Sequence, residues 1–182
     1  MKLSVVIPAY NEEDSIEETV LAFHEKLRLE KIPHEILISH DNSTDSTEKI
    51  LKSLSKQIKE VRYINNPPPN GFGFAVRNGL EHFTGDCVAV VMADMSDRPV
   101  DLINYYRTML KGNYDAVFGS RFIKGGKVVD YPKNKLFLNR FTNTLIKIMF
   151  GIRYNDVTNA FKLYKRETGK VKSSCFYAFV EE

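Results

Sequence analysis

The sequence predicts an α/β fold in which helices flank a mostly parallel β-sheet. Three observations lead to this fold class. Short apolar runs alternate along the chain with segments whose apolar residues recur at helical spacing, which is the pattern of successive βαβ units. Each apolar run ends in a polar, turn-forming loop. The 182 residues, 43% of them hydrophobic, are enough to bury the core of one domain.

The first unit begins with an apolar strand at Leu3–Ile7. Asn11 offers an N-cap for the helix that follows. One face of this helix is apolar and carries Ile16, Val20, Phe23 and Leu27 at helical spacing. A strand followed by an amphipathic helix is typical of the first half of a βαβ unit.

The second unit begins with a strand at Glu35–Ser39. The segment Asp41–Ser46 is dense in capping residues, and the next helix has an apolar face of Ile50, Leu54 and Ile58. A short third strand spans Val61–Ile64. The loop Asn65–Gly71 contains three consecutive prolines, which cannot join a sheet.

The remaining elements continue the alternation. A third helix is expected from about Gly73 to Phe83 and a fourth strand from Cys87 to Met92. A helix at Leu102–Leu110 and a fifth strand at Ala116–Gly119 follow. This order predicts that the strands lie parallel and that helices connect them.

The fourth strand leads directly to two carboxylates, Asp94 and Asp97. In a parallel α/β sheet, ligands bind just beyond the carboxyl ends of the strands. Together with the Ser96 hydroxyl, the two carboxylates form an all-oxygen half-shell suited to Mg²⁺ or Mn²⁺, whose other ligands would be water and a diphosphate. The alternative is that Asp97 only caps the helix after Pro99.

Composition narrows the class of protein. A net charge of +3 is too small to indicate a nucleic-acid partner by itself. The two cysteines, Cys87 and Cys175, provide no metal cluster, and a reduced cytoplasmic protein is expected because Cys87 lies inside a strand. The first residues enter a strand without the pattern of a signal peptide. No apolar run approaches the roughly 20 residues that span a bilayer.

The loops at the other strand ends hold candidate ligands for a nucleotide. The segment Pro8–Glu12 turns at a proline and presents the Tyr10 ring and backbone groups, which could hold a nucleobase. Asp41 is a candidate acceptor for a base N–H, and Arg77 and Arg121 are candidates for phosphate oxygens. The alternatives are that the amide and carboxylate of the first segment are helix caps, that the aspartate closes a turn, and that the arginines lie on the surface.

Five motifs, taken in order, resemble a known family. They are Val6–Glu13, Asp41–Asp45, Gly71–Gly79, Met92–Pro99 and Gly119–Arg121. Together they resemble the family 2 glycosyltransferases, and within that family the dolichol-phosphate or polyprenyl-phosphate sugar transferases. The resemblance extends from Leu3 to about Tyr164, so it covers most of the chain.

The resemblance implies a GT-A fold, a Rossmann-like and mostly parallel sheet, over residues 1–164, followed by an atypical tail at 165–182. It implies that a sugar is moved from a GDP- or UDP-linked nucleoside diphosphate sugar to a polyprenyl phosphate, with inversion and with Mg²⁺ or Mn²⁺. The implied catalytic residues are Asp94, Asp97 and Arg121, and the implied metal ligands are Asp94, Ser96 and Asp97. The implied contacts with the nucleotide sugar are Pro8, Ala9, Tyr10, Asn11, Glu12, Asp41, Gly73, Arg77, Ala93 and Asp94.

Two positions depart from the family's motifs. His40 precedes Asp41 where the family usually has a pair of acids, so one carboxylate on the base side is missing. Met92 stands in place of the first acid of the family's Asp-x-Asp element. The resemblance therefore implies altered metal ligation, in which Asp94 is the main carboxylate.

The reaction can be argued from charge alone. Breaking the bond between sugar and diphosphate develops negative charge on the leaving group, which a metal at Asp94 and the nearby Arg121 would stabilise. A phosphate monoester has a second pKa of about 6, so a lipid phosphate acceptor is largely ionised at neutral pH. No dedicated general base is then needed.

The segment Lys133–Phe150 predicts a basic amphipathic helix. Its apolar residues are Phe137, Phe141, Leu145, Ile148 and Met149, with Leu138 and Ile146 widening the face, and its basic rim is Lys133, Lys135, Arg140, Lys147 and Arg153. Such a helix can lie in a membrane interface and approach a lipid phosphate, so we expect a peripheral position on the cytoplasmic membrane face. The alternative is a helix packed on the sheet.

The C-terminal part leaves the function open. Family members normally continue beyond Tyr164 with an acidic element near the acceptor, and only Asp156 occupies such a position here, where it could equally be a turn residue. We therefore expect slow or absent sugar transfer from this chain. A catalytically silent nucleotide-sugar-binding protein is one alternative. A sugar nucleotidyltransferase is another, although Pro8–Asn11 is not the Gly-rich triphosphate loop that such an enzyme carries.

Overall fold

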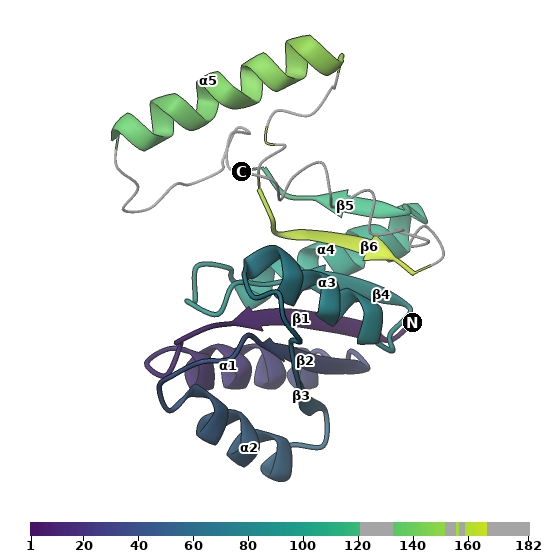
Figure 1. The fold of residues 1–182 in the computed structure, drawn as a ribbon. Helices are drawn as coiled ribbons and strands as arrows, with labels where there is room; N and C mark the ends of the chain where they lie inside the picture. Colours follow the sequence, from purple (N-terminus) through teal and green to yellow (C-terminus); the bar gives the residue numbers. More distant parts are fainter. Residues whose placement is uncertain (121–132, 152–155, 157–158, 167–182) are drawn as a thin grey trace. The chain divides into compact units, whose positions relative to one another are not determined.

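The computed structural model describes residues 1–120, 133–151, 156 and 159–166, with the backbone alone described at 133–137. Strands and helices alternate along this part of the chain (Figure 1). The strands are β1 (Leu3–Ala9), β2 (His34–His40), β3 (Val61–Asn65), β4 (Cys87–Val90), β5 (Ala116–Phe118) and β6 (Lys162–Lys165). The helices are α1 (Ile16–Leu29), α2 (Thr47–Gln57), α3 (Phe72–His82), α4 (Pro99–Gly112) and α5 (Lys133–Phe150).

The strands form a sheet in the order β3-β2-β1-β4-β6-β5. β1 pairs in parallel with β2 and with β4, and β2 pairs in parallel with β3. β6 runs antiparallel to β4, with Cys87 opposite Lys165. The mostly parallel sheet predicted from the sequence is therefore confirmed, and the antiparallel β6 is an addition that the sequence pattern did not indicate.

Helices cover both faces of the sheet (Figure 1). β1 is buried along its whole length, so its alternate side chains enter two cores. On one face, β1 packs with apolar residues of α1, α2 and α4 through Leu3, Val5, Ile7 and Ala9. On the other face, Val6 packs with Leu37 and Val88, and Leu80 of α3 covers them.

Helix α3 approaches β1 closely because of Gly79. A Cβ at this position would meet Val6 Cγ1 at 2.4 Å, so a larger residue would force the helix or the strand to move. The preceding Asn78 is buried, and its Nδ2 donates to Ser39 Oγ and to Asn65 O, each at 3.2 Å. Asn78 and Gly79, the last two residues of the motif Gly71–Gly79, therefore hold α3 against β1, β2 and β3.

Several element ends differ from the predictions. β4 ends at Val90 rather than Met92, because Met92 N donates to Asp97 Oδ2 at 2.9 Å instead of extending the sheet. α1 begins at Ile16, and its N-cap residue is Ser15. α4 begins at Pro99 rather than at the predicted Leu102, since a proline in the first turn needs no partner for a backbone N–H.

The chain divides into two compact units, Met1–Val117 together with the chain from Phe161 onward, and Phe118–Ala160. The first unit contains the sheet and helices α1–α4, and the second contains α5. α5 carries exposed apolar side chains at Leu138, Phe141, Leu145, Ile148, Met149 and Phe150. No helix in the described part of the chain combines the length and the hydropathy of a membrane-spanning segment.

Candidate functional site

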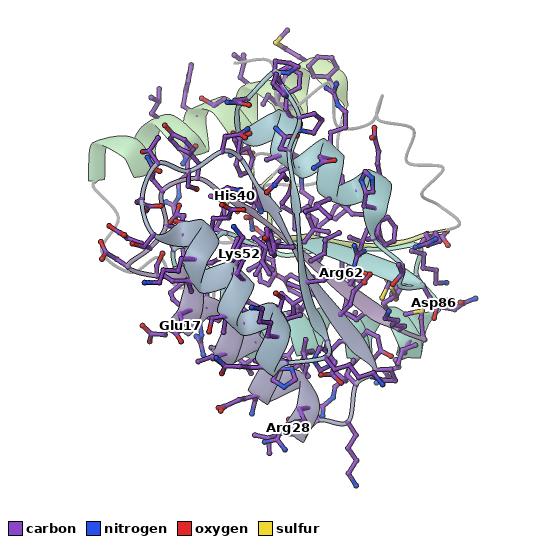
Figure 2. The ribbon with its side chains drawn as sticks, turned by 60° about the horizontal axis from the view of Figure 1, so that its bottom comes forward. Glu17, Arg28, His40, Lys52, Arg62 and Asp86 are labelled. Carbon is purple, nitrogen blue, oxygen red and sulfur yellow. The ribbon has the colours of Figure 1, made fainter. Side chains whose placement is uncertain are left out.

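The carboxyl ends of three parallel strands bring together the loops that the sequence singled out. Ala9 of β1 pairs with His40 of β2, and Val6 of β1 pairs with Val90 of β4. The loops that follow these strands therefore leave from one edge of the sheet, which we call the carboxyl edge. Figure 2 labels His40 at this edge and Asp86 at the opposite, amino edge.

The loops after β1 and β2 are joined through Asn11. Its backbone N donates to Ser43 Oγ at 3.1 Å, and its Oδ1 accepts from Thr44 N at 2.8 Å. Asn11 has a φ of 53°, a left-handed conformation that asparagine tolerates better than most residues. The prediction that Asn11 caps α1 is therefore wrong, because its side chain bonds the neighbouring loop instead.

Acidic residues strengthen this junction. Glu13 Oε2 accepts from Ser46 N at 2.8 Å, and Asp45 Oδ2 accepts from Glu13 N at 3.1 Å. Glu12 N donates to Thr47 Oγ1 at 2.9 Å, and Thr47 N donates to Asp45 Oδ1 at 2.9 Å. Desolvation opposes ionisation of Asp45, but the hydrogen bonds from Thr47 and Glu13 outweigh it and lower the pKa of the carboxyl. We call this reciprocal set of bonds the loop junction.

Asp41 holds both ends of the proline-rich loop. Its side chain is buried, Oδ1 accepts from Asn66 Nδ2 at 2.7 Å, and Oδ2 accepts from Gly71 N at 2.7 Å. These contacts match the alternative in which Asp41 closes a turn. Each carboxylate oxygen has a second lone pair, so a contact with a base N–H stays a prediction.

His40 stands where the resembling family has an acid. Its Nε2 accepts from Ser43 N at 3.0 Å, so the ring hydrogen lies on Nδ1, which donates to Asn65 Oδ1 at 3.0 Å. The neutral ring thus connects the end of β2 with the end of β3 and with its own following loop. In place of the acid that the family usually has here, the chain has a ring that makes two directional hydrogen bonds.

The loop at residues 91–98, which we call the acidic loop, presents Asp94 and Ser96 to solvent. Asp94 Oδ1 accepts from Ser96 N at 3.0 Å, and Met95 between them has a φ of 61°. Asp97 is half-buried and accepts from Met92 N, which closes the loop. The N-cap position of α4 is Arg98, without a side-chain cap bond, so the alternative that Asp97 caps this helix is wrong.

The oxygens of the acidic loop fit a hard divalent cation. Asp94 and Asp97 supply carboxylates and Ser96 supplies a hydroxyl, and within the described residues no three His, Cys, Asp or Glu side chains are arranged so that they could hold a metal ion by themselves. Mg²⁺ and Mn²⁺ accept such a sparse protein shell because diphosphate and water complete it. Zn²⁺, which usually takes three or four protein ligands, does not suit this site.

The other predicted nucleotide contacts differ in exposure. Tyr10 is 55% exposed at the end of β1. Pro8, Ala9 and Ala93 are buried, so at these positions a ligand could meet only backbone groups. Tyr10 is therefore an exposed aromatic ring in the segment that enters the loop junction.

The remaining candidates belong to α3 and to a segment outside the described residues. Gly73 lies in the first turn of α3, and the Arg77 guanidinium carbon lies 5.3 Å from the centroid of the Phe74 ring. That cation–π contact fixes part of the orientation of the arginine. Arg121 lies outside the described residues. Asp156, the late acid in the sequence, is buried at 3% exposure in the second unit.

The sequence analysis missed four buried polar residues that hold these loops, namely Thr19, Thr47, Asn66 and Asn78. Thr19 carried a readable signal, because it lies on the same helix face as Ile16 and Phe23. A polar side chain in an apolar stripe needs a buried partner. The two asparagines carried no such signal, since one lies in an irregular loop and the other beside a helix glycine.

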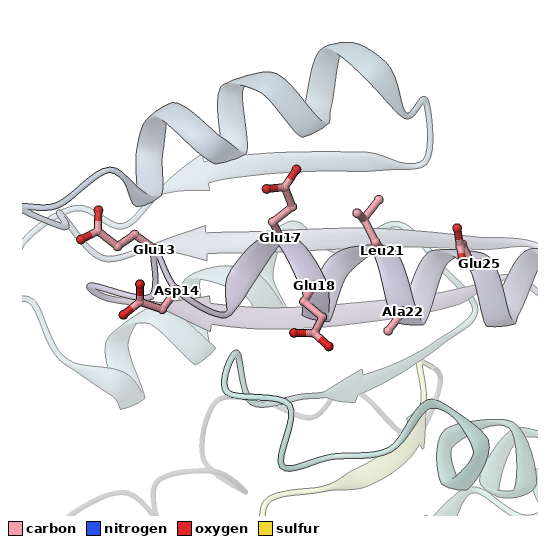
Figure 3. Close-up of a pocket in the computed structure, with 7 residues that line it drawn as sticks. All are labelled: Glu13, Asp14, Glu17, Glu18, Leu21, Ala22 and Glu25. Atoms are coloured by element: carbon pink, nitrogen blue, oxygen red, sulfur yellow. The ribbon is translucent and has the colours of Figure 1, made fainter.

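A hollow along α1 is chemically different from the carboxyl-edge loops (Figure 3). It is lined by Glu13, Asp14, Glu17, Glu18, Leu21, Ala22 and Glu25. Its five carboxylates would repel the negative charge of a diphosphate. The acidic loop, with its few carboxylates spaced for a cation, is therefore the better candidate for a donor site.

The fold is that of a mostly parallel α/β protein, a class that binds its ligands at the carboxyl ends of the strands, where the polar loops and acidic oxygens of this chain gather. Comparison with known families narrows the class. The profile described as glycosyl transferase family 2 matches residues 4–170, and the chain belongs to this family.

Relatives and solved structures agree with this family. A dolichol-phosphate mannosyltransferase of Pyrococcus furiosus is 33% identical over 132 residues, which cover 72% of this chain and 36% of that protein. The glycosyltransferase AglD of Haloferax volcanii is 28% identical over 169 residues, 92% of this chain and 27% of that protein. The chain thus spans well under half the length of either relative.

The fold is shared with glucosyl-3-phosphoglycerate synthase of Mycobacterium tuberculosis. Its complex with Mn²⁺, uridine diphosphate and phosphoglyceric acid has a TM-score of 0.68 at 19% identity, over 91% of this chain and 56% of that one. Its complex with Mn²⁺, UDP-glucose and phosphoglyceric acid has a TM-score of 0.67 at 22% identity. The GT-A fold predicted from the sequence motifs is therefore confirmed.

Proposed function

We propose that this chain forms the donor-binding part of a glycosyltransferase that moves a sugar from a GDP- or UDP-linked donor to a polyprenyl phosphate. The observation that carries the proposal is the exposed Asp94 carboxylate at the carboxyl edge, beside the rigid loop junction. The named relative acts with dolichol phosphate and mannose, and the structural neighbours were solved with Mn²⁺ and UDP. The name of the relative supports the lipid phosphate as acceptor, and the solved complexes support a nucleotide donor bound together with Mn²⁺.

Different residues of the carboxyl edge can bind different parts of such a donor. Tyr10 offers a ring face to the base, and Asp41 a buried carboxylate beside it. Asp94, Ser96 and Asp97 would hold Mg²⁺ or Mn²⁺, which when bound neutralises charge on the departing diphosphate. Arg77 and Arg121 are proposed to meet the phosphate oxygens. Inversion would follow from one direct attack by an acceptor phosphate that is already ionised.

The helix α5 is proposed to meet the membrane that holds a polyprenyl phosphate. Its exposed apolar residues include Phe141 and Ile148, at 58% and 73% exposure, and Arg140 and Lys147 lie on the same helix. Exposed apolar residues with cationic neighbours suit the boundary between acyl chains and anionic headgroups. The side chain of Phe137, which belongs to the predicted apolar face, lies outside the described residues.

Vesicle binding tests this part of the proposal. Phe141→Ser combined with Ile148→Ser should reduce cosedimentation with vesicles that contain an anionic lipid, while nucleotide binding stays unchanged. Thr144→Ser on the same helix is the control and should bind as the unmodified chain does. Binding should also weaken with added salt, because salt screens exposed charges. Parallel loss of nucleotide binding and of stability in the double variant would contradict a membrane role.

A nucleotide-sugar-binding protein without turnover is the second candidate. His40 and Met92 replace two acids of the family's motifs, and both oxygens of Asp41 already accept hydrogen bonds within the chain. Release of nucleoside diphosphate from a nucleotide sugar, with and without polyprenyl phosphate vesicles, separates the two candidates. Release that depends on the acceptor supports the transferase.

The deciding experiment is a thermal-shift panel of UDP, GDP and their sugar conjugates, each with and without Mn²⁺. A ligand that binds the native state raises its stability, by about 2.7 kcal/mol at 100 times its dissociation constant. We expect one base to stabilise the chain, and more strongly with Mn²⁺. If no nucleotide shifts the unfolding temperature in either condition, the proposed function is wrong.

A further inference from the structure

Thr19 carries a fully buried hydroxyl in the first turn of α1, and its partner lies in the acidic loop. Its Oγ1 donates to Ala93 O at 2.7 Å. A threonine inside a helix commonly bonds a carbonyl of its own helix one turn back. Here the hydroxyl bonds a residue 74 positions later in the sequence. α1 is therefore connected directly to the residue that precedes Asp94.

Two kinds of hydrogen bond hold the acidic loop. The bonds from Met92 N to Asp97 and from Ser96 N to Asp94 join residues within the loop and set its shape. The Thr19 bond joins the loop to another element and so sets its position. Ala93 is only 2% exposed, so its carbonyl needs a partner from the protein.

We infer that Thr19 is a positioning residue that fixes the Asp94 carboxylate for the metal and diphosphate end of the donor. The inference rests on the proposed function. The Ala93 oxygen lies in the same planar peptide unit as the N and Cα atoms of Asp94. Holding that oxygen therefore fixes the plane from which the carboxylate projects. A group that binds a metal works only within a narrow range of positions, and its supporting residues set that range.

Thr47 provides a matched control within the same molecule. It is also a fully buried threonine at the carboxyl edge, and its Oγ1 accepts from Glu12 N at 2.9 Å. Its hydroxyl holds the loop junction rather than the acidic loop. The same substitution at the two threonines therefore loosens two different parts of the candidate site.

The experiment compares Thr19→Val with Thr47→Val, because valine keeps the shape of threonine and removes the hydroxyl. The affinity for the nucleoside diphosphate that stabilises the unmodified chain, UDP or GDP, is measured by calorimetry with and without Mn²⁺. In Thr19→Val the gain in affinity that Mn²⁺ provides should fall about tenfold, as for loss of a residue that orients a metal ligand. In Thr47→Val the gain should persist while the metal-free affinity falls.

Thr19→Ser keeps the hydroxyl and should restore the Mn²⁺-dependent gain. If Thr19→Val does not fold, Thr19→Cys supplies a weak donor in its place and should show an intermediate gain. An unaltered gain in the valine variant, or in the cysteine variant when that one is used, overturns the inference and leaves the proposed function standing. Absence of any Mn²⁺-dependent gain in an unmodified chain that still binds the nucleotide also overturns the inference, whereas absence of nucleotide binding in both conditions overturns the proposed function.

Discussion

At the amino edge of the sheet, a buried carboxylate that pairs with cations holds the loop between α3 and β4. At the carboxyl edge, uncharged hydrogen-bond donors hold the loops. Glu35 at the amino edge accepts from Ser4 Oγ at 2.5 Å and from Arg62 Nε at 3.2 Å. Asp41 and Asp45 at the carboxyl edge accept from backbone N–H groups and an amide. The negative charge of Glu35 at the amino edge is balanced by Arg62. The negative charges of Asp41 and Asp45 at the carboxyl edge meet only uncharged donors in these hydrogen bonds.

Two arginines at the amino edge bond the end of α3 and the loop that follows it. Arg62 also donates to His82 O, at the end of α3. Arg166, just after β6, donates through Nε to Gly85 O at 2.8 Å and through Nη2 to Phe83 O at 2.5 Å. The bonds to His82 O and Phe83 O satisfy carbonyls that the end of α3 would otherwise leave without partners, and the bond to Gly85 O holds the loop that follows. The polar groups of the amino edge therefore stabilise the fold.

The difference separates the polar groups that stabilise the fold from those that are proposed to bind a ligand. A carboxylate that accepts from neutral donors keeps its negative charge available to a cation, and a rigid loop presents that charge without rearrangement. A carboxylate matched by arginine attracts a metal far less. Substitutions of acids at the two edges should therefore have different consequences for binding and for stability.

The largest effect is expected from Asp94→Asn at the carboxyl edge. It should reduce the Mn²⁺-dependent gain in nucleotide affinity by about 100-fold, because the amide replaces the main carboxylate of the acidic loop. The free energy of unfolding should change by less than about 0.5 kcal/mol, since the side chain is exposed. Calorimetry with and without Mn²⁺ measures the first quantity and urea unfolding the second. Retention of the full Mn²⁺ gain would remove Asp94 from the metal site.

The opposite pattern is expected from Glu35→Gln at the amino edge. The free energy of unfolding should fall by about 2–3 kcal/mol, because a buried charge-assisted bond is lost and Arg62 keeps an unmatched charge. Nucleotide affinity should stay unchanged. Glu48→Gln breaks the exposed pair with Lys52 on α2 and should leave the free energy of unfolding almost unchanged in the same urea titration.

Acid provides an independent check on Glu35. Burial alone would raise its pKa, but the bonds from Ser4, Thr84 and Arg62 outweigh burial and lower the pKa from 4.5 to about 2. The unfolded chain therefore takes up the proton first as the pH falls. The stability that Glu35 contributes is complete above the unfolded pKa and is lost as the pH falls from about 4.5 toward 2. In Glu35→Gln this part of the pH dependence should be missing.

A smaller loss of stability than that of Glu35→Gln is expected from Asp45→Asn in the loop junction. One of its two accepted hydrogen bonds should be lost, which lowers the free energy of unfolding by about 1 kcal/mol. The Mn²⁺-dependent gain should be unaltered, because the acidic loop does not use this residue. A loss of stability as large as that of Glu35→Gln would show that the acids of the carboxyl edge stabilise the fold as strongly as those of the amino edge.

The strand and helix pattern could be predicted because it depends on burial. Val5, Val88 and their neighbours form continuous apolar runs, and the apolar face of α1 repeats with the helical period. β6 was missed since Lys162–Lys165 is only four residues long and buries a single residue, Leu163, so it shows no strand pattern. Its place between β4 and β5 depends on the return of the chain from the second unit, which no local pattern encodes.

The candidate site was predicted only in part, for a related reason. Asp94 and Ser96 could be identified because polar residues after a buried strand face solvent. The partners of Asn11 and Asp41 could not, since each bonds residues of another loop at least 25 positions away, as Asn66 does with Asp41. Predicting such pairs requires the register of the sheet, because the register determines which loops lie next to one another.

The position of β6 has a consequence for the order in which the chain can assemble. β5 is separated from β4 by a strand that lies more than forty residues later in the sequence. While the chain is being synthesised, β1, β2, β3 and β4 can join in their parallel arrangement at once, but β5 must wait. The four-stranded part of the sheet, which carries the acidic loop, can therefore form first. Residues 118–160 are synthesised next, and β5 joins the sheet only after β6 has followed them.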